Sequence, residues 1–284
     1  MNSTRHALRV GARRGWHEQV LSLRSSQDQA FYLFMTLGTL AFLYFNRNNM
    51  VDGIGLSLAQ VAMPSILAAV LVFGFVVGPS QSIAMEREDG TVLRLASAPG
   101  GTTAYATGQI VLHATSLLPT LILLVVPAVL LFDAGSQRGA EGWLAAIVVI
   151  TLGVLATLPI GIIIGCLVPD ARRATTWGIL PVIIAILISG VLVPVTQLWT
   201  WLQPIALVSP LYWFGHGLRF AFLPDAAKAA ELGGEWNMTA CVLILLAWAV
   251  VSWAVAFVTL RRAGRRQSGA AIATARDRAS QWVR

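Results

Sequence analysis

Six long apolar blocks, separated by polar segments, dominate the pattern along the chain. None of the blocks contains Asp, Glu, Lys or Arg; they cover residues 30–45, 54–78, 110–132, 144–168, 177–195 and 241–260. About 20 apolar residues are needed to cross the hydrocarbon core of a bilayer as a helix. Inside lipid each backbone polar group must be paired within its own segment, which favours helices. The pattern predicts an all-α polytopic membrane protein with six transmembrane helices.

The basic residues between the blocks predict the orientation of these helices. If the amino terminus lies inside, segments 1–29, 79–109, 169–176 and 261–284 also lie inside, and they hold 16 of the 20 Lys and Arg residues. Segments that face the cytoplasm carry an excess of these residues. We therefore expect both termini in the cytoplasm, with a membrane domain at 30–260 and a basic tail at 261–284.

The amino-terminal segment 1–29 shows a helical spacing of apolar residues. Ala12, Trp16, Val20 and Leu23 fall on one face, and most of the charged residues fall elsewhere. This pattern predicts an amphipathic helix along the cytoplasmic surface of the membrane. The alternative is a solvated basic tail that only helps to set the topology. Anionic lipid is the expected partner of the basic ends, and the chain needs no nucleic acid to explain its charge.

The segment from 196 to 240 is predicted to lie outside, and its first half is rich in aromatic residues. Its apolar stretch could form a seventh span, but that span would place the basic tail outside, against the charge rule. Pro194, Pro204 and Pro210 also divide it into pieces too short to cross. Trp199 and Trp201 suit a membrane interface. We predict a re-entrant or outer-surface helical hairpin between spans 5 and 6; an ordinary loop lying on the lipid is the alternative.

The composition supports a membrane protein and excludes several enzyme classes. The chain is 56% hydrophobic and 12% charged, whereas soluble domains carry about 25% charged residues. Its single lysine, Lys228, follows no glycine-rich loop, so a phosphate-binding P-loop is excluded. The four histidines lack the spacing of a zinc protease. We expect no catalytic residue, cofactor or metal on this chain.

One charged island interrupts this apolar chain on the predicted cytoplasmic side. Between residues 84 and 109 lie Glu86, Arg87, Glu88, Asp89 and Arg94. The run 99–101, Pro-Gly-Gly, indicates a break. After it, Thr102 or Thr103 is expected to cap a short helix that runs through Tyr105 toward the third span. This pattern predicts a docking surface, and an ordinary solvated loop is the alternative.

The order of residues in this island resembles the cytoplasmic loop of the type-two ATP-binding-cassette exporter permeases. The matching residues are Glu86, Arg87, Gly90, Thr91, Arg94, Leu95, Pro99 and Gly108. Leu93 and Gln109 depart from the family pattern, which often has an acidic residue and a lysine there. The segment from 189 to 219 is similar to the family's fifth span and outer hairpin, through Ser189, Gly190, Pro194, Trp201, Leu202, Pro210, Tyr212 and Arg219.

The resemblance implies the membrane subunit of a bacterial drug or lipid exporter in the inner or plasma membrane. It implies a coupling helix at about residues 98–106 that docks on a pair of cytoplasmic ATPase subunits, where ATP and Mg would bind, and a second permease, identical or related. Spans 2 and 5 would line the substrate path. Spans without Asp, Glu, Lys or Arg favour a hydrophobic or amphipathic substrate. A polysaccharide exporter of the same family, or a membrane-anchored enzyme or sensor, stays open.

Overall fold

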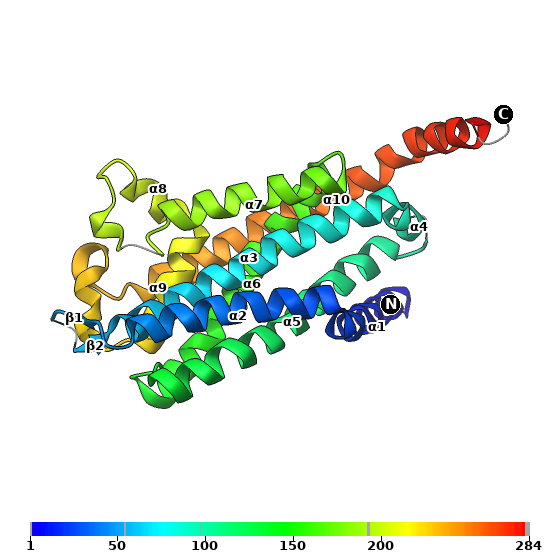
Figure 1. Cartoon of the computed structure of the whole chain (residues 1–284). Helices are drawn as coiled ribbons and strands as arrows, with labels where there is room; N and C mark the ends of the chain where they lie inside the picture. Colours follow the sequence, from blue (N-terminus) through cyan, green and yellow to red (C-terminus); the bar gives the residue numbers. More distant parts are fainter. Residues whose placement is uncertain (1, 54, 97, 192–193, 282–284) are drawn as a thin grey trace.

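The computed structural model describes residues 2–53, 55–96, 98–191 and 194–281, and it is a bundle of helices (Figure 1). The helices are α1 (Asn2–Arg24), α2 (Ser26–Asn46), α3 (Leu58–Glu88), α4 (Thr91–Ala96), α5 (Gly101–Phe132), α6 (Gly139–Leu167), α7 (Ala171–Ile188), α8 (Gln203–Val208), α9 (Pro210–Phe222) and α10 (Met238–Gln281). Two short strands, β1 (Met50–Val51) and β2 (Leu56–Ser57), pair antiparallel, and the 3-10 turns are η1 (Val195–Gln197), η2 (Asp225–Ala230) and η3 (Leu232–Gly234). The predicted all-α class is confirmed.

Four of the described helices are long and apolar enough to cross a membrane. They are α3, α5, α6 and the part of α10 from Met238 to Ala263. The predicted spans 30–45 and 177–195 coincide with α2 and α7. Each of the six apolar blocks therefore contains a helix, although α3 begins at Leu58, after β2, and α7 ends at Ile188. That α2 and α7 cross the membrane stays a prediction.

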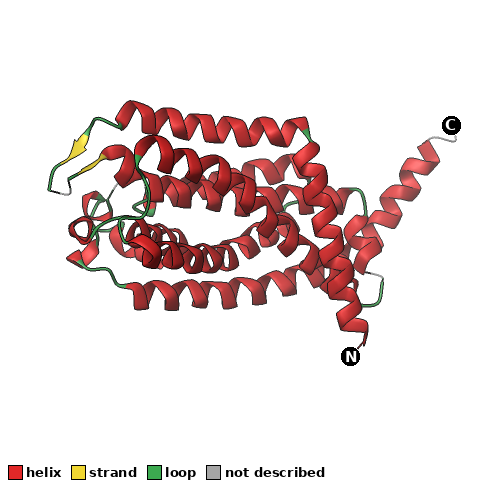
Figure 2. Ribbon diagram, turned by 90° about the horizontal axis from the view of Figure 1, so that it is seen from below, coloured by secondary structure: helices red, strands yellow, loops and turns green. Residues whose placement is uncertain are grey.

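Helix α3 occupies the centre of the bundle and carries much of its core. Its start is fixed by a capping box, in which Ser57 and Gln60 each bind the other's backbone N–H. Met63, Leu67 and Leu71 recur about once per turn and are almost fully buried. They belong to one continuous hydrophobic cluster to which α6 and α9 also contribute. Figure 2 shows the long helices running roughly parallel, so the two ends of the bundle hold the loops.

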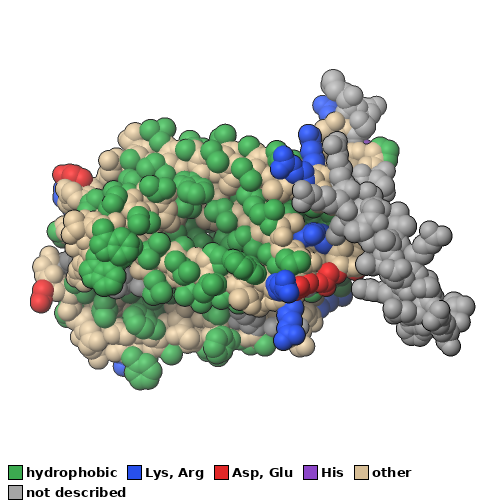
Figure 3. Space-filling view, turned by 90° about the horizontal axis from the view of Figure 1, so that it is seen from above, with side chains coloured by type: hydrophobic (Ala, Val, Ile, Leu, Met, Phe, Trp, Pro, Cys, Tyr) green, Lys and Arg blue, Asp and Glu red, His purple; other side chains and the backbone are tan. Residues whose placement is uncertain are grey.

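The two ends of the bundle differ in composition. Helices α1 and α4 and the far part of α10 lie at one end, here called the α4 end; β1, β2 and α8 lie at the other, here called the β-hairpin end (Figure 1). Figure 3 shows apolar side chains over the body and charged side chains gathered toward the ends. Large apolar residues such as Leu130 on α5, Ile147 on α6 and Val250 on α10 are exposed. An apolar surface of this extent marks contact with lipid or with another protein.

The amino-terminal segment is helical, as predicted, but it packs through residues that the apolar pattern did not single out. Helix α1 lies along α5 and buries Ala7, Gly11, Gly15 and Gln19, which recur every four residues. A Cβ atom at Gly11 would lie 2.2 Å from the carbonyl oxygen of Ala104, and one at Gly15 would lie 2.3 Å from that of Gly108. Small residues at this spacing let two helix backbones approach closely.

The predicted apolar face of α1 stays outside this contact. Trp16 is 55% exposed and Leu23 is 44% exposed, whereas Ala12 and Val20 are half-buried. The exposed tryptophan and leucine remain available to lipid, in agreement with the expected amphipathic helix. Its position along the membrane surface stays a prediction.

We predict that alanine at Gly11 or Gly15 will loosen α1 from α5. The gain in helix propensity, about 1 kcal/mol, is opposed by backbone overlap that costs roughly 1–3 kcal/mol. Limited proteolysis of the α1 segment and thermal unfolding in detergent would measure the effect. Gly38→Ala is the matched control, because a Cβ atom there meets nothing within 4 Å. Equal protection of α1 in all three variants would contradict the tight packing.

Candidate functional site

The charged island forms a turn, the short helix α4 and a second turn between α3 and α5. Gly90 follows the end of α3 with a φ of 77°, a conformation that favours glycine. The predicted short helix at about 98–106 is wrong, because α5 begins at Gly101 and continues unbroken through Tyr105 to Phe132. The short helix of this loop is α4, over Thr91–Ala96. Neither predicted threonine caps α5; Gly100 occupies the N-cap without a side-chain bond.

Glu86 joins α3 to α1. Its carboxylate accepts a bond of 2.6 Å from Arg14, and Arg14 also donates to Glu18 at 2.6 Å. The Arg14 guanidinium lies 5.4 Å from the centre of the buried Tyr105 ring on α5, within the range of a cation–π interaction. These residues connect α1, α3 and α5. The predicted site residues Glu86 and Tyr105 therefore hold the α4 end together.

Arg87 points into the fold and binds the end of α6. Its Nη1 atom lies 2.9 Å from the carbonyl oxygen of Gly165 and 2.8 Å from those of Cys166 and Val168. The last carbonyl groups of a helix have no partner within the helix and carry partial negative charge. The guanidinium group of Arg87 donates hydrogen bonds to these carbonyl groups, and its positive charge balances their partial negative charge. Arg87 therefore fixes α6 to the end of α3.

The other predicted residues of the island remain at the surface. Asp89 accepts from the Thr91 backbone N–H at 2.8 Å, and bonds from Thr91 lower the pKa of this carboxyl. Arg94 is exposed and its Nη2 donates to the Asp89 carbonyl and the Thr91 hydroxyl at 3.3 Å each. Leu95 is half-buried and Pro99 is exposed. The island thus has two parts. Glu86 and Arg87 contact other helices and form its inward pair, whereas Asp89, Arg94 and Pro99 are exposed and form its outward face.

The predicted outer hairpin is a pair of helices, α8 and α9, but only part of it faces outward. Trp201 is 62% exposed and stacks on Trp199 with ring centres 5.9 Å apart. Pro194 precedes η1, and Pro210 is the first residue of α9. In α9, residues 211–218 are all buried, among α3, α6 and α10. How deeply the pair enters the membrane stays a prediction.

A buried carboxylate, that of Glu231, ties this region together. Arg219 donates to it through Nε, and through Nη2 at 3.1 Å. Tyr212 donates its hydroxyl at 3.2 Å, and the Nδ1 atom of His216 lies 2.8 Å away. Arg219 also reaches Ser65 on α3 at 3.3 Å. The predicted residues Tyr212 and Arg219 thus meet at one acceptor.

The environment of Glu231 favours the charged carboxylate. The group is only 3% exposed. Burial by itself raises the pKa of a carboxyl, but hydrogen bonds from His216 and Arg219 and the charge of Arg219 outweigh it and lower the pKa of Glu231 to about 2. The cluster stabilises the β-hairpin end, because both carboxylate oxygens of Glu231 bond to side chains of α9.

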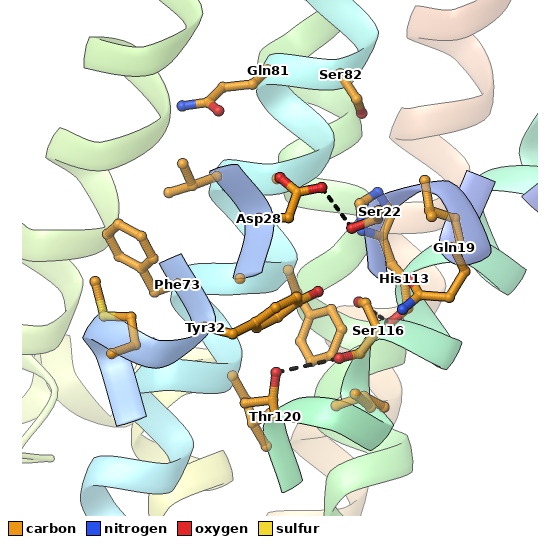
Figure 4. A pocket seen from close by; sticks show the side chains of 18 of the residues that line it. Gln19, Ser22, Asp28, Tyr32, Phe73, Gln81, Ser82, His113, Ser116 and Thr120 are labelled. Atoms are coloured by element: carbon orange, nitrogen blue, oxygen red, sulfur yellow. Dashed lines mark hydrogen bonds between the residues drawn. The ribbon is translucent and has the colours of Figure 1, made fainter. Parts of the chain in front are cut away.

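A cavity of about 810 Å³ opens between α1, α2, α3 and α5 (Figure 4). Ser22 donates to Asp28 at 2.7 Å at its polar side, while Phe73 and Leu124 lie among its apolar lining residues. Figure 4 shows Tyr32 reaching across the middle. The volume falls in the usual range of small-molecule sites, about 300–1,000 Å³. The resemblance implies a path along spans 2 and 5, whereas α7 contributes Ile179 alone to this cavity.

Local sequence patterns do not indicate several residues of these sites. Arg14 and Glu231 contact residues far away along the chain, and no local pattern marks them. The repeat of small residues at Ala7, Gly11 and Gly15 is a local signal for close helix packing. It could have predicted the contact between α1 and α5.

The helices and their apolar surface define a multi-pass helical membrane protein. The family model described as "ABC-2 type transporter" matches residues 16–223. The chain therefore belongs to the ABC-2 type transporter family.

Two curated relatives carry the same name, "Probable multidrug ABC transporter permease YbhR", in Escherichia coli strain K12 and in Escherichia coli O157:H7. Each is 27% identical over 190 residues, which cover 65% of this chain. The same region covers 48% of each relative, so the chain spans about half the length of the curated relatives it matches.

We predict that Arg87→Met will lower the free energy of unfolding by roughly 2–4 kcal/mol, because carbonyl groups at a buried helix end lose their partner. Thermal unfolding in detergent, followed by tryptophan fluorescence, would measure it. Arg94→Met is the matched control, since Arg94 is exposed and its bonds to Asp89 and Thr91 are 3.3 Å long. Similar losses in both variants would contradict a distinct role of Arg87 in holding α6.

A second prediction concerns the stability of the fold at low pH. Because the pKa of Glu231 is lower in the folded protein than its ordinary value of 4.5, the ionised group stabilises the fold above about pH 4.5, and this contribution is lost as the pH falls toward 2. Glu231→Gln should lower stability at pH 7 by roughly 3 kcal/mol and flatten the acid dependence. The exposed Glu235→Gln serves as control; an unchanged acid profile in Glu231→Gln would refute the role of the cluster.

Proposed function

We propose that the chain is the membrane-spanning permease subunit of an ATP-driven exporter. Energy would come from a separate pair of cytoplasmic ATPase subunits, where ATP and Mg would bind, and a second permease would complete the membrane part. Family membership supports this assignment. The relatives named as probable multidrug permeases support a drug-like substrate, and a lipid-like one is proposed from the apolar spans alone.

In this proposal the α4 end faces the cytoplasm and six helices cross the cell membrane. The excess of Lys and Arg in segments 1–29, 79–109, 169–176 and 261–284 supports the orientation. Helices α1 and α4 and the far part of α10 lie at the same end of the bundle, in agreement with one cytoplasmic side (Figure 1). Helices α2 and α7 would then be the first and fifth spans.

The observation that carries the proposal is the division of the charged island. Its outward face, with Asp89, Arg94 and Pro99, is open to a partner at the α4 end. Its inward pair, Glu86 and Arg87, binds α1 and α6 directly. A displacement of α4 by an ATPase would therefore reach α1, α3 and α6 through short polar contacts. ATP shifts the helices only if the ATPase contacts differ between two states of the permease.

The first test is gentle detergent extraction of the tagged chain from its native membrane, followed by mass spectrometry. An ATP-binding-cassette ATPase in near-equal amount supports the proposal, and a second, different permease would identify a heteromer. Enzymatic activity of the purified chain alone, with no copurified ATPase in several mild detergents, would favour a membrane-anchored enzyme or sensor.

We predict that Glu86→Gln and Arg94→Ala will each uncouple transport from ATP hydrolysis while the protein still inserts in the membrane. Glu86→Gln weakens the link to Arg14, and Arg94→Ala removes a charge from the docking face. We expect each variant to transport about tenfold less substrate per ATP hydrolysed, within the range of a typical loss of coupling between two sites. Arg47→Ala, an exposed arginine beside β1, is the control. Unchanged coupling ratios in both island variants would remove these residues from the coupling path.

A further inference from the structure

The cavity between α1, α2, α3 and α5 is lined by both apolar and polar residues, and its charged residues share one sign. Its charged lining residues are Glu18, Asp28 and Glu86, and all three are acidic. Arg14 forms ion pairs with both Glu18 and Glu86 at 2.6 Å. For Asp28, no cation lies within ion-pair distance in the part of the chain that the structure describes; Ser22 donates a hydrogen bond to it at 2.7 Å.

Gln19 gives a second, independent sign of an absent partner. The side chain is 2% exposed and lines the cavity. Among the described residues, neither its amide nitrogen nor its amide oxygen has a hydrogen-bond partner. A buried amide without partners is unfavourable, and native proteins keep few of them without a reason. A ligand in the cavity that donates hydrogen bonds would satisfy the oxygen.

The apolar residues of the lining suit the apolar part of a cationic ligand. Aromatic rings of Tyr32, Phe73 and Phe75 line the cavity, and such rings attract cations as well as apolar groups. Leu117 and Leu124 extend the apolar surface along α5. Figure 4 shows Asp28 and Ser22 close together, with the hydroxyl of Tyr32 pointing away from Phe73.

We propose that this cavity binds an amphipathic molecule with a protonated amine. The ammonium group would lie at Asp28 and donate to the oxygen of Gln19, and the apolar body would extend between Phe73 and Leu124. Two sources carry this chemistry: a free amphiphilic amine, or a lipid with an amine in its headgroup. The proposal that the cavity binds an amine does not depend on the proposed function. A role of the cavity as an entry site for export from the cytoplasmic side rests on the proposed function.

Binding can be measured without an ATPase. The full chain in phosphatidylcholine nanodiscs would be titrated with dansylcadaverine, a fluorescent primary amine, and with the dansyl pentylamide that lacks the amine. We expect saturable binding of the amine and at least about tenfold weaker binding of the neutral analogue, since a charge-assisted bond of this kind is worth about 1.5–3 kcal/mol. Equal affinity for both probes would overturn the proposal.

Two variants locate the site. Asp28→Asn keeps the acceptor for Ser22 and removes the charge, so we expect the amine to bind about tenfold more weakly; the exposed Asp52→Asn at the β-hairpin end should bind as the native chain does. Gln19→Leu should also weaken binding several-fold while the melting temperature stays equal or rises, because an unpaired buried amide is removed. Native affinity in both cavity variants would place the amine elsewhere and refute the site.

A last comparison separates the two sources. Native chain in nanodiscs that contain phosphatidylethanolamine should bind the dye more weakly if the lipid amine occupies the cavity, and this competition should disappear in Asp28→Asn. Equal dye affinity in both lipids would identify free amphiphilic amines as the occupants. Failure to copurify an ATPase would remove the proposed function and leave these binding results intact, so the two hypotheses fail separately.

Discussion

Polar groups inside a membrane protein need partners from the protein itself, and this constraint explains how both ends of the molecule are built. Where α6 ends, Arg87 supplies donors to the last carbonyl groups. Where the chain buries Glu231, three side chains surround its carboxylate. Between these ends the helices satisfy their own backbones and expose apolar side chains. The placement of charge therefore follows from the solvent around the bundle.

The same constraint explains what could be predicted from the sequence. Long runs without charged residues mark helices because hydrocarbon admits few alternatives, and each of the six runs contains a helix in the structure. The helix of the amino-terminal segment was also predictable from its periodicity. Whether a helix crosses the membrane is harder to predict. Helices α2 and α7 form as expected, but their length and apolar content do not by themselves establish that they cross the membrane.

Other features depend on contacts between residues far apart in the chain, and local patterns do not contain them. Glu86 meets Arg14 across 72 positions, which turns a residue that looked like part of a docking face into an internal link. Tyr212 and Arg219 were singled out by resemblance, but their partner Glu231 lies in a segment without a recognisable motif. The short helix was misplaced because Pro99 and the following glycines were taken as its start, whereas the backbone at Gly100 begins the long helix α5.

The unequal construction of the two ends has a mechanical consequence. At the β-hairpin end a buried ionic cluster joins α9 to α3 and to the segment after η2, and separating these parts would leave charges unpaired in an apolar surrounding. At the α4 end α1 touches α5 through glycines, and one arginine is shared between two carboxylates. The ion pairs of Arg14 are partly exposed, so separating them costs less than separating the buried pair of Arg219 and Glu231. A partner that docks at the α4 end would therefore exchange the contacts of α1 at a lower cost than those around Glu231, which keep the β-hairpin end fixed.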